Sequence, residues 1–207
     1  MAQKIGRHTT PDMTRIGEII ETSSVSLVAE SEKLNQPPPL GSLCEVQVSD
    51  ACTIYAVVAF GRTGGLDPGR RAVRRGTSEA SDEAVYRQHP ELARVLRTEF
   101  VAVLAGWTDG RRMWQRLPAQ PPPLHYSIHA CTHETLRRFS DQLMYFRLLL
   151  NMPGELSGDQ LLAAHIAEAY RVRGEDQIWL ERAGKEVAGL LKNDHERLMS
   201  VLLAIEP

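Results

Sequence analysis

The 207-residue sequence lacks the features of a membrane-spanning or exported protein. No apolar run approaches the roughly 20 residues that a helix needs to cross a bilayer, so we expect no membrane span. The first residues, MAQKIGRHTTPDMTR, are polar and contain no apolar signal region. Cysteine is scarce, and Cys44, Cys52 and Cys131 form no CxxC pair, which is typical of free thiols in a reducing compartment. We therefore expect a cytoplasmic protein.

Catalytic signatures are missing as well. A phosphate-binding loop reads GxxxxGK[ST], but of the four lysines only Lys185 follows a glycine, and Glu186 comes after it. The GxSxG turn that presents a nucleophilic serine is also missing. Paired acids stand where helices are expected to begin, a position that carboxylates favour without any catalytic role. These pairs are Asp82/Glu83, Glu175/Asp176 and Asp194/Glu196. The sequence predicts no catalytic residue, no cofactor, no metal ion and no small-molecule substrate.

The net charge of −2 gives no overall attraction to nucleic acid or to an anionic membrane. Binding to either would have to come from a local patch. Hydrophobic residues at 43% and charged residues at 24% are typical of a globular chain that can bury a core.

Short apolar or alternating runs in residues 14–118 predict a sheet. The run Cys52–Phe60 is almost wholly apolar, which is typical of a strand covered on both faces. Asp50-Ala51 and Asp109-Gly110 are short turns that favour hairpins. Six strands suffice to close a small antiparallel barrel. The expected strands are Arg15–Glu21, Ser24–Glu30, Leu43–Ser49, Cys52–Phe60, Thr98–Trp107 and Arg111–Leu117. Residues 1–13 are expected to form a flexible arm, and a short helix broken at Pro90 is expected over Glu83–Arg97.

Prolines separate this sheet from a helical region. Pro121, Pro122 and Pro123 fix the backbone in an extended form, so residues 119–131 are interpreted as a stiff connector. Residues 132–207 have helical spacing and predict a bundle of about four helices. The predicted helices are 132–150 with Thr132 as N-cap, 157–174 with a Ser157/Gln160 capping box and Gly174 at its end, 175–192, and a last one capped by Asn193. The fold class is therefore α+β, with the barrel first and the helical domain second.

Three segments resemble the HAS-barrel, the N-terminal barrel of HerA-like DNA-translocating ATPases and of ATP synthase head subunits. They are IGEIIETSSVSLVAESEKLNQPPPLGSLCEVQV, YRQHPELARVLRTEFVAVLAGW and LPAQPPPLHYSIHACTHE, which together span roughly residues 14–135 in the family's order and spacing. In HerA-like proteins a similar proline segment leads into the ATPase core. This sequence has no P-loop, so the resemblance implies a barrel without its motor.

A glycine-rich tract at residues 61–82 holds the first candidate contact residues. They are Arg62, Arg70, Arg71, Arg74 and Arg75. Guanidinium groups pair bidentately with phosphate and carboxylate, so a flexible loop could bring them to a nucleic acid or to an acidic protein partner. The alternative is a solvated loop whose charges only maintain solubility. No aromatic residues alternate with these arginines, which weakens a single-stranded nucleic-acid interpretation. We favour a protein partner over DNA because the chain as a whole is not basic.

Arg112, Trp114 and Arg116 share one face of the last expected strand. They form either an exposed binding strip or a tryptophan at the barrel rim covered by stacked arginines, and we favour the second.

The segment HYSIHACTH raises a metal site as a further alternative. In an extended chain His125, His129, Cys131 and His133 point to the same face, and imidazoles with a thiol are zinc ligands. Neighbouring same-face positions on one strand lie about 6.5–7 Å apart, so one strand cannot surround a tetrahedral ion. We favour histidines packed between the barrel and the helices, with His125 part of the connector.

These observations lead to one functional hypothesis and one main alternative. The first is a non-enzymatic interaction or assembly module, a stand-alone HAS-like barrel that docks on a larger complex or assembles with its own copies. A HerA-like ATPase or a nuclease is the partner that the resemblance implies. The alternative is a nucleic-acid-associated protein that contacts phosphates through the Arg62–Arg75 loop.

Overall fold

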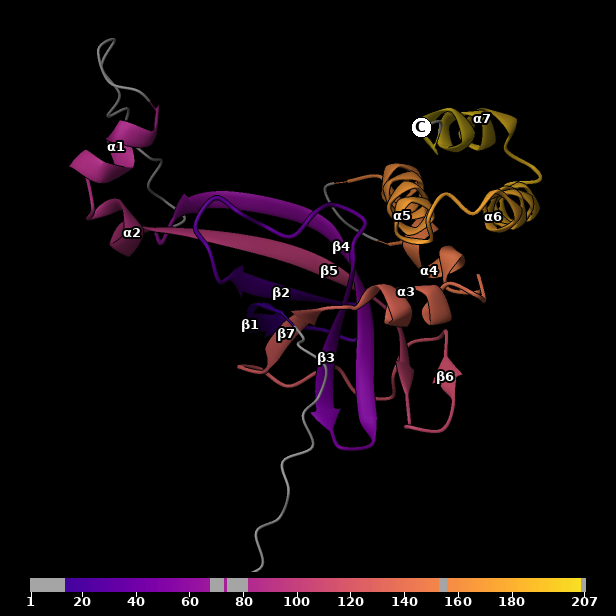
Figure 1. Cartoon of the computed structure of the whole chain (residues 1–207), viewed down its shortest axis with the longest axis horizontal. Coiled ribbons are helices and arrows are strands. Elements are labelled where there is room, and N and C mark those ends of the chain that lie inside the picture. Colours follow the sequence, from indigo (N-terminus) through magenta and orange to yellow (C-terminus); the bar gives the residue numbers. More distant parts are fainter. Residues whose placement is uncertain (1–13, 68–72, 74–81, 153–155, 206–207) are drawn as a thin grey trace, which may run out of the picture.

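The computed structural model describes residues 14–67, 73, 82–152 and 156–205. Within this part of the chain, six strands form a closed antiparallel ring in the order β2-β1-β7-β3-β4-β5, and β5 pairs back to β2 (Figure 1). The ring strands are β1 (Arg15–Thr22), β2 (Ser26–Ser31), β3 (Leu43–Ser49), β4 (Cys52–Gly65), β5 (Leu96–Thr108) and β7 (Ser127–Ala130). The predicted closed six-stranded antiparallel barrel and the α+β class are confirmed.

One strand of the ring is not the predicted one. The expected sixth strand, Arg111–Leu117, is reduced to β6 (Met113–Trp114), which pairs with β5 alone. The barrel is closed instead by β7, which lies in the segment interpreted as a connector and bridges β1 to β3. The physical reason is burial: Ile128 is completely buried in the barrel interior, whereas both residues of β6 stay partly exposed.

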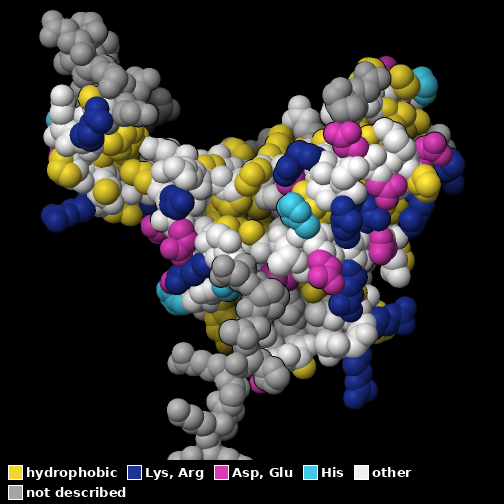
Figure 2. All heavy atoms as spheres, in the orientation of Figure 1, with side chains coloured by type: hydrophobic (Ala, Val, Ile, Leu, Met, Phe, Trp, Pro, Cys, Tyr) yellow, Lys and Arg dark blue, Asp and Glu magenta, His cyan; other side chains and the backbone are white. Residues whose placement is uncertain are grey.

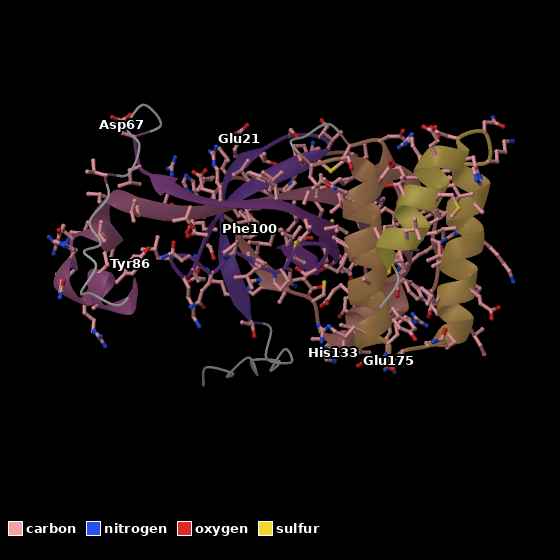
Figure 3. All side chains as sticks on the ribbon, turned by 90° about the horizontal axis from the view of Figure 1, so that it is seen from above. Glu21, Asp67, Tyr86, Phe100, His133 and Glu175 are labelled. Atoms are coloured by element: carbon pink, nitrogen blue, oxygen red, sulfur yellow. The ribbon has the colours of Figure 1, made fainter. Side chains whose placement is uncertain are left out.

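Side chains fill the interior of the barrel. Phe100, Leu104, Ile19 and Ile128 have no exposed surface and pack with smaller residues from the other strands. Small barrels are commonly filled in this way, so their interior is a core and not a binding cavity. The figure seen from above places Phe100 in the middle of the barrel (Figure 3).

The opposite face of the same wall packs against helices. Tyr55, Val57 and Ala59 of β4 alternate with interior residues and contact the buried side chains of the helical region. The prediction that β4 is covered on both faces is confirmed. Helices and barrel therefore share a hydrophobic core, in addition to the core inside the barrel.

Strands β4 and β5 continue past the barrel as a two-stranded arm (Figures 1 and 3). Pairing of β3 with β4 reaches only Val57, whereas β4 and β5 stay paired from Gly61↔Phe100 to Gly65↔Leu96. The arm carries α1 (Asp82–Gln88) and α2 (Leu92–Val95), which lie on either side of Pro90 as predicted, although Leu96 and Arg97 belong to β5. We call these two helices, together with Leu66, the arm tip.

The helical region begins with α3 (His133–Phe139) and α4 (Phe146–Leu150), followed by α5 (Gly158–Val172), α6 (Gln177–Leu190) and α7 (His195–Ile205). The N-caps Thr132 and Ser157 are confirmed, because their hydroxyls accept from the backbone N–H of Thr135 and Gln160. Gly174, at φ 76°, follows the end of α5 as predicted.

Two details of the helical prediction are wrong. A single helix over 132–150 does not form, because the chain turns between α3 and α4. The N-cap of α7 is Asp194 instead of Asn193, since the Asp194 carboxylate accepts from the Arg197 N–H at 3.1 Å. None of the helices in the described ranges is both long and apolar enough to cross a membrane.

Candidate docking surface

The arginine tract is only partly visible in the described residues. Arg70, Arg71, Arg74 and Arg75 lie outside them. Arg62 belongs to β4 and not to a loop, and its Nε and Nη2 donate to Oε2 of Glu99 at 2.9 and 2.6 Å. Arg97 Nε lies 2.7 Å from the other carboxylate oxygen of Glu99. Arg62 is therefore a strand residue in an ion-pair network on the arm, and its side chain is still 63% exposed to solvent.

Glu99 is the centre of this network and is 5% exposed. A carboxylate so deeply buried needs compensating charge, which the two guanidinium groups supply from the same strand and from the strand opposite.

Arg112, Trp114 and Arg116 are brought together as the sequence suggested. The guanidinium carbons of Arg112 and Arg116 lie 4.3 and 4.6 Å from the centre of the Trp114 ring, within cation–π distance. Trp107 of β5 stacks on Trp114 with ring centroids 6.0 Å apart. The tryptophan is covered on its faces, which agrees with the rim interpretation. The two guanidinium groups remain exposed and are held in place by the ring.

The connector residues help to form the barrel wall. His125 has a φ of 63°, a left-handed backbone conformation that turns the chain into β7. Its N–H donates to the Ile19 carbonyl at 2.9 Å, and its Nδ1 lies 2.9 Å from Oε1 of Glu18. This contact lowers the pKa of Glu18. Of the prolines, Pro121 is exposed and Pro122 is buried, and with Pro123 they form extended chain that precedes β7.

The metal site, which the spacing along one strand already disfavoured, has no support in the described residues. They contain no group of three or more His, Cys, Asp or Glu side chains close enough to hold an ion. His125 turns to Glu18, and the Cys131 thiol lies near enough to the carboxyl of buried Glu45 for each group to influence the pKa of the other. Burial raises the pKa of both groups in that pair. His129 is half-buried, and burial lowers its pKa, as expected for a histidine packed against the barrel.

An apolar pocket that no sequence pattern indicated lies at the seam between the barrel and α4. Its volume is about 200 Å³, and it is lined mainly by apolar residues from four separate segments. The contributing side chains include Val25, Val103, Leu117, Leu148 and Met152, together with Arg147. No local spacing joins these residues, so only the folded chain reveals them. We call this the seam pocket.

The surface thus offers cation-rich and apolar contact areas, while the strongly perturbed titratable groups are inside. Burial raises the pKa of the Tyr145 hydroxyl and of the Cys44 thiol far above their ordinary values, which keeps both groups neutral. Neutral buried thiols are poor nucleophiles. No known protein-family model matches this chain, and no curated protein sequence matches it either.

Proposed function

We propose that this chain is a non-enzymatic interaction and assembly module built on a HAS-like barrel. It docks on a larger complex, such as one that contains a HerA-like ATPase or a nuclease, or it assembles with copies of itself. The barrel is already filled by its own side chains, so its contacts with other molecules are made from the outside.

The observation that carries this proposal is the arm. It extends beyond the barrel on the side away from the helices, where Tyr86 lies far from His133 and Glu175 (Figure 3). Leu66, Tyr86 and Val95 at the arm tip are 48%, 44% and 47% exposed. Hydrophobic side chains gather over α1 and α2 in the space-filling view (Figure 2). Large apolar groups gathered on a protruding element are typical of interaction sites.

The arm is also positioned by specific contacts. The Asn35 backbone N–H donates to the Thr98 hydroxyl at 2.6 Å, and the Asn35 side chain donates to the Tyr86 hydroxyl at 2.6 Å. Asn35 thereby fixes α1 against the loop that follows β2. Presenting a contact surface in one fixed position lowers the entropy lost on binding.

The test removes the arm tip and leaves the barrel intact. Because Gly65 pairs directly with Leu96, residues 66–95 can be replaced by Asn-Gly, the two-residue turn that closes a hairpin. Full-length and shortened chains are then compared by light scattering and by affinity purification from the native host. We expect the full-length chain to form a defined complex or oligomer and the shortened chain to lose it. ATP turnover by the purified full-length chain, or identical assembly of both chains, would contradict the proposal.

Nucleic-acid binding through the arginine tract remains the alternative that the sequence raised. It predicts a salt-dependent shift of DNA mobility that disappears when Arg70, Arg71, Arg74 and Arg75 become alanine. The pairing of Arg62 with Glu99 reduces the charge that this tract can offer, so the geometry favours the protein partner.

A further inference from the structure

The seam pocket has the size and lining of a site for one side chain. An apolar cavity of about 150 Å³ accepts a benzene-sized group, so about 200 Å³ accommodates an aromatic or branched aliphatic residue. Leu117 is 37% exposed and Val25 is 38% exposed, so the pocket is open to a residue arriving from outside. Such an opening in an otherwise well-packed seam between β2, β5 and α4 is a place for an anchor residue.

One arginine lines this opening, and two more lie on the hairpin segment that leads to it. Arg147 lines the pocket itself, and Arg116 directly precedes Leu117. The guanidinium groups of Arg112 and Arg116 lie within about 9 Å of each other, because both stack on the Trp114 ring. In the part of the chain that the structure describes, no carboxylate pairs with the guanidinium group of Arg112, Arg116 or Arg147. Basic side chains also cover the β5–β6 hairpin in Figure 2.

We propose that the seam pocket binds a short acidic, amphipathic segment of a partner protein, with one apolar side chain in the pocket and flanking carboxylates on Arg112, Arg116 and Arg147. Guanidinium groups that lack an internal partner and are already held in place lose little entropy when they bind carboxylates. This inference rests on the proposed function and names the chemistry of the partner.

The residues that line the pocket favour a protein partner over a nucleic acid. Single-stranded nucleic acid needs an open aromatic face on which a base can stack. Here the Trp114 ring is covered by Trp107 and by the two arginines, and the pocket is lined by aliphatic side chains. A peptide with one apolar residue between acidic residues complements both the apolar pocket and the arginines near it.

The test selects random phage-displayed peptides on the full-length chain and on two variants that differ only in charge. Val25→Glu and Val25→Lys remove the same apolar contact from the pocket wall, but only the first brings a carboxylate to repel an acidic peptide. We expect the full-length chain and Val25→Lys to enrich peptides in which Asp and Glu flank a Leu, Ile, Phe or Met. We expect Val25→Glu to enrich none of them. Peptides without acidic flanks, or equal enrichment on Val25→Glu, would overturn the proposal.

The best-enriched peptide is then measured by fluorescence anisotropy. Arg147→Glu should weaken its binding at least about ten-fold at low salt, and Arg147→Lys, which keeps the charge, should weaken it much less. An unchanged affinity in Arg147→Glu, or displacement of the peptide by oligothymidylate, would refute the assignment. A partner that is recovered by affinity purification and binds the Val25→Glu chain equally well would eliminate this site while the interaction module stands. The arm-shortened chain keeps the pocket, so the two proposals can fail separately.

Discussion

Acid should destabilise this protein through one buried histidine, His165 of α5. The side chain has no exposed surface and lies between two partners. Its Nδ1 is 2.6 Å from the Gly41 carbonyl, which can only accept, so Nδ1 carries the proton and donates. Its Nε2, 2.6 Å from the Tyr145 hydroxyl, therefore accepts from that group. A second proton on Nε2 would reverse this hydrogen bond and place an uncompensated charge in the core.

The magnitude follows from the pKa difference between the folded and unfolded states. Burial lowers the pKa of His165 from its ordinary 6.5 to about 4. Below pH 6.5 the unfolded chain binds a proton that the folded chain does not, so the free energy of unfolding falls as the pH falls towards 4. The slope is about 1.4 kcal/mol per pH unit and the total loss is about 3 kcal/mol.

The assay is urea unfolding followed by tryptophan fluorescence, since Trp179 is buried in the helical region. His165→Gln is the matched variant, because it keeps hydrogen-bonding capacity but does not titrate. We expect it to cost about 1–3 kcal/mol at pH 7 and to show a weaker pH dependence than the native chain between pH 6.5 and 4. The difference between the two slopes isolates His165 from the other titrating groups. Equal slopes in the two proteins would refute the reasoning.

Three further predictions concern the barrel. Phe100→Ala should lower the free energy of unfolding by about 3–5 kcal/mol, because a fully buried ring is removed from the barrel interior; a urea midpoint within error of the native one would contradict this. Glu99→Gln should cost about 1–3 kcal/mol by removing the charge that Arg62 and Arg97 share, and the same titration checks it against Glu21→Gln, an exposed acid that forms no ion pair within the described residues. Cys44, whose pKa is raised by burial, should resist alkylation in the folded protein while the partly exposed Cys52 reacts first, as mass spectrometry of timed samples can show; early modification of Cys44 would count against a filled barrel.

Local patterns predicted the elements that have strong local causes. The apolar run of β4 indicated cover on both faces, and one face does line the barrel while the other lies under the helices. The turns at Asp50-Ala51 and Asp109-Gly110 join the strands that they were expected to join. These features depend on the chemistry of a few neighbouring residues, which a sequence displays directly.

The missed features depend on contacts between distant segments. Phe139, Leu143, Phe146 and Leu150 recur at helical spacing and are all buried, but burial alone does not distinguish a continuous helix from two short ones. The turn between α3 and α4 is stabilised from α6 and the end of α5. Arg173 donates to the Arg137 carbonyl at 2.9 Å, and Trp179 Nε1 donates to the Ser140 carbonyl at 2.7 Å. These donors satisfy carbonyls at the end of α3, and no pattern within residues 132–150 indicates that they will do so.

The candidate site also contains parts that depend on local sequence and parts that depend on contacts between distant segments. The Arg112–Trp114–Arg116 stack follows from alternation along one short segment, so the sequence was sufficient to predict it. The seam pocket combines β2, β5, the chain after β6 and α4, and the ion pair of Arg62 with Glu99 joins two strands across the arm. Such groupings exist only after the barrel has closed.

The late position of β7 in the chain has a consequence for synthesis. Strands β1 and β3 are made early, yet the segment that lies between them, Ser127–Ala130, leaves the ribosome only after all the other strands. Until then the nascent sheet has two open edges, which are prone to pair with other chains. The prolines before His125 restrict the backbone of the chain that leads to this strand, which lowers the entropy that this leading chain loses when the wall closes.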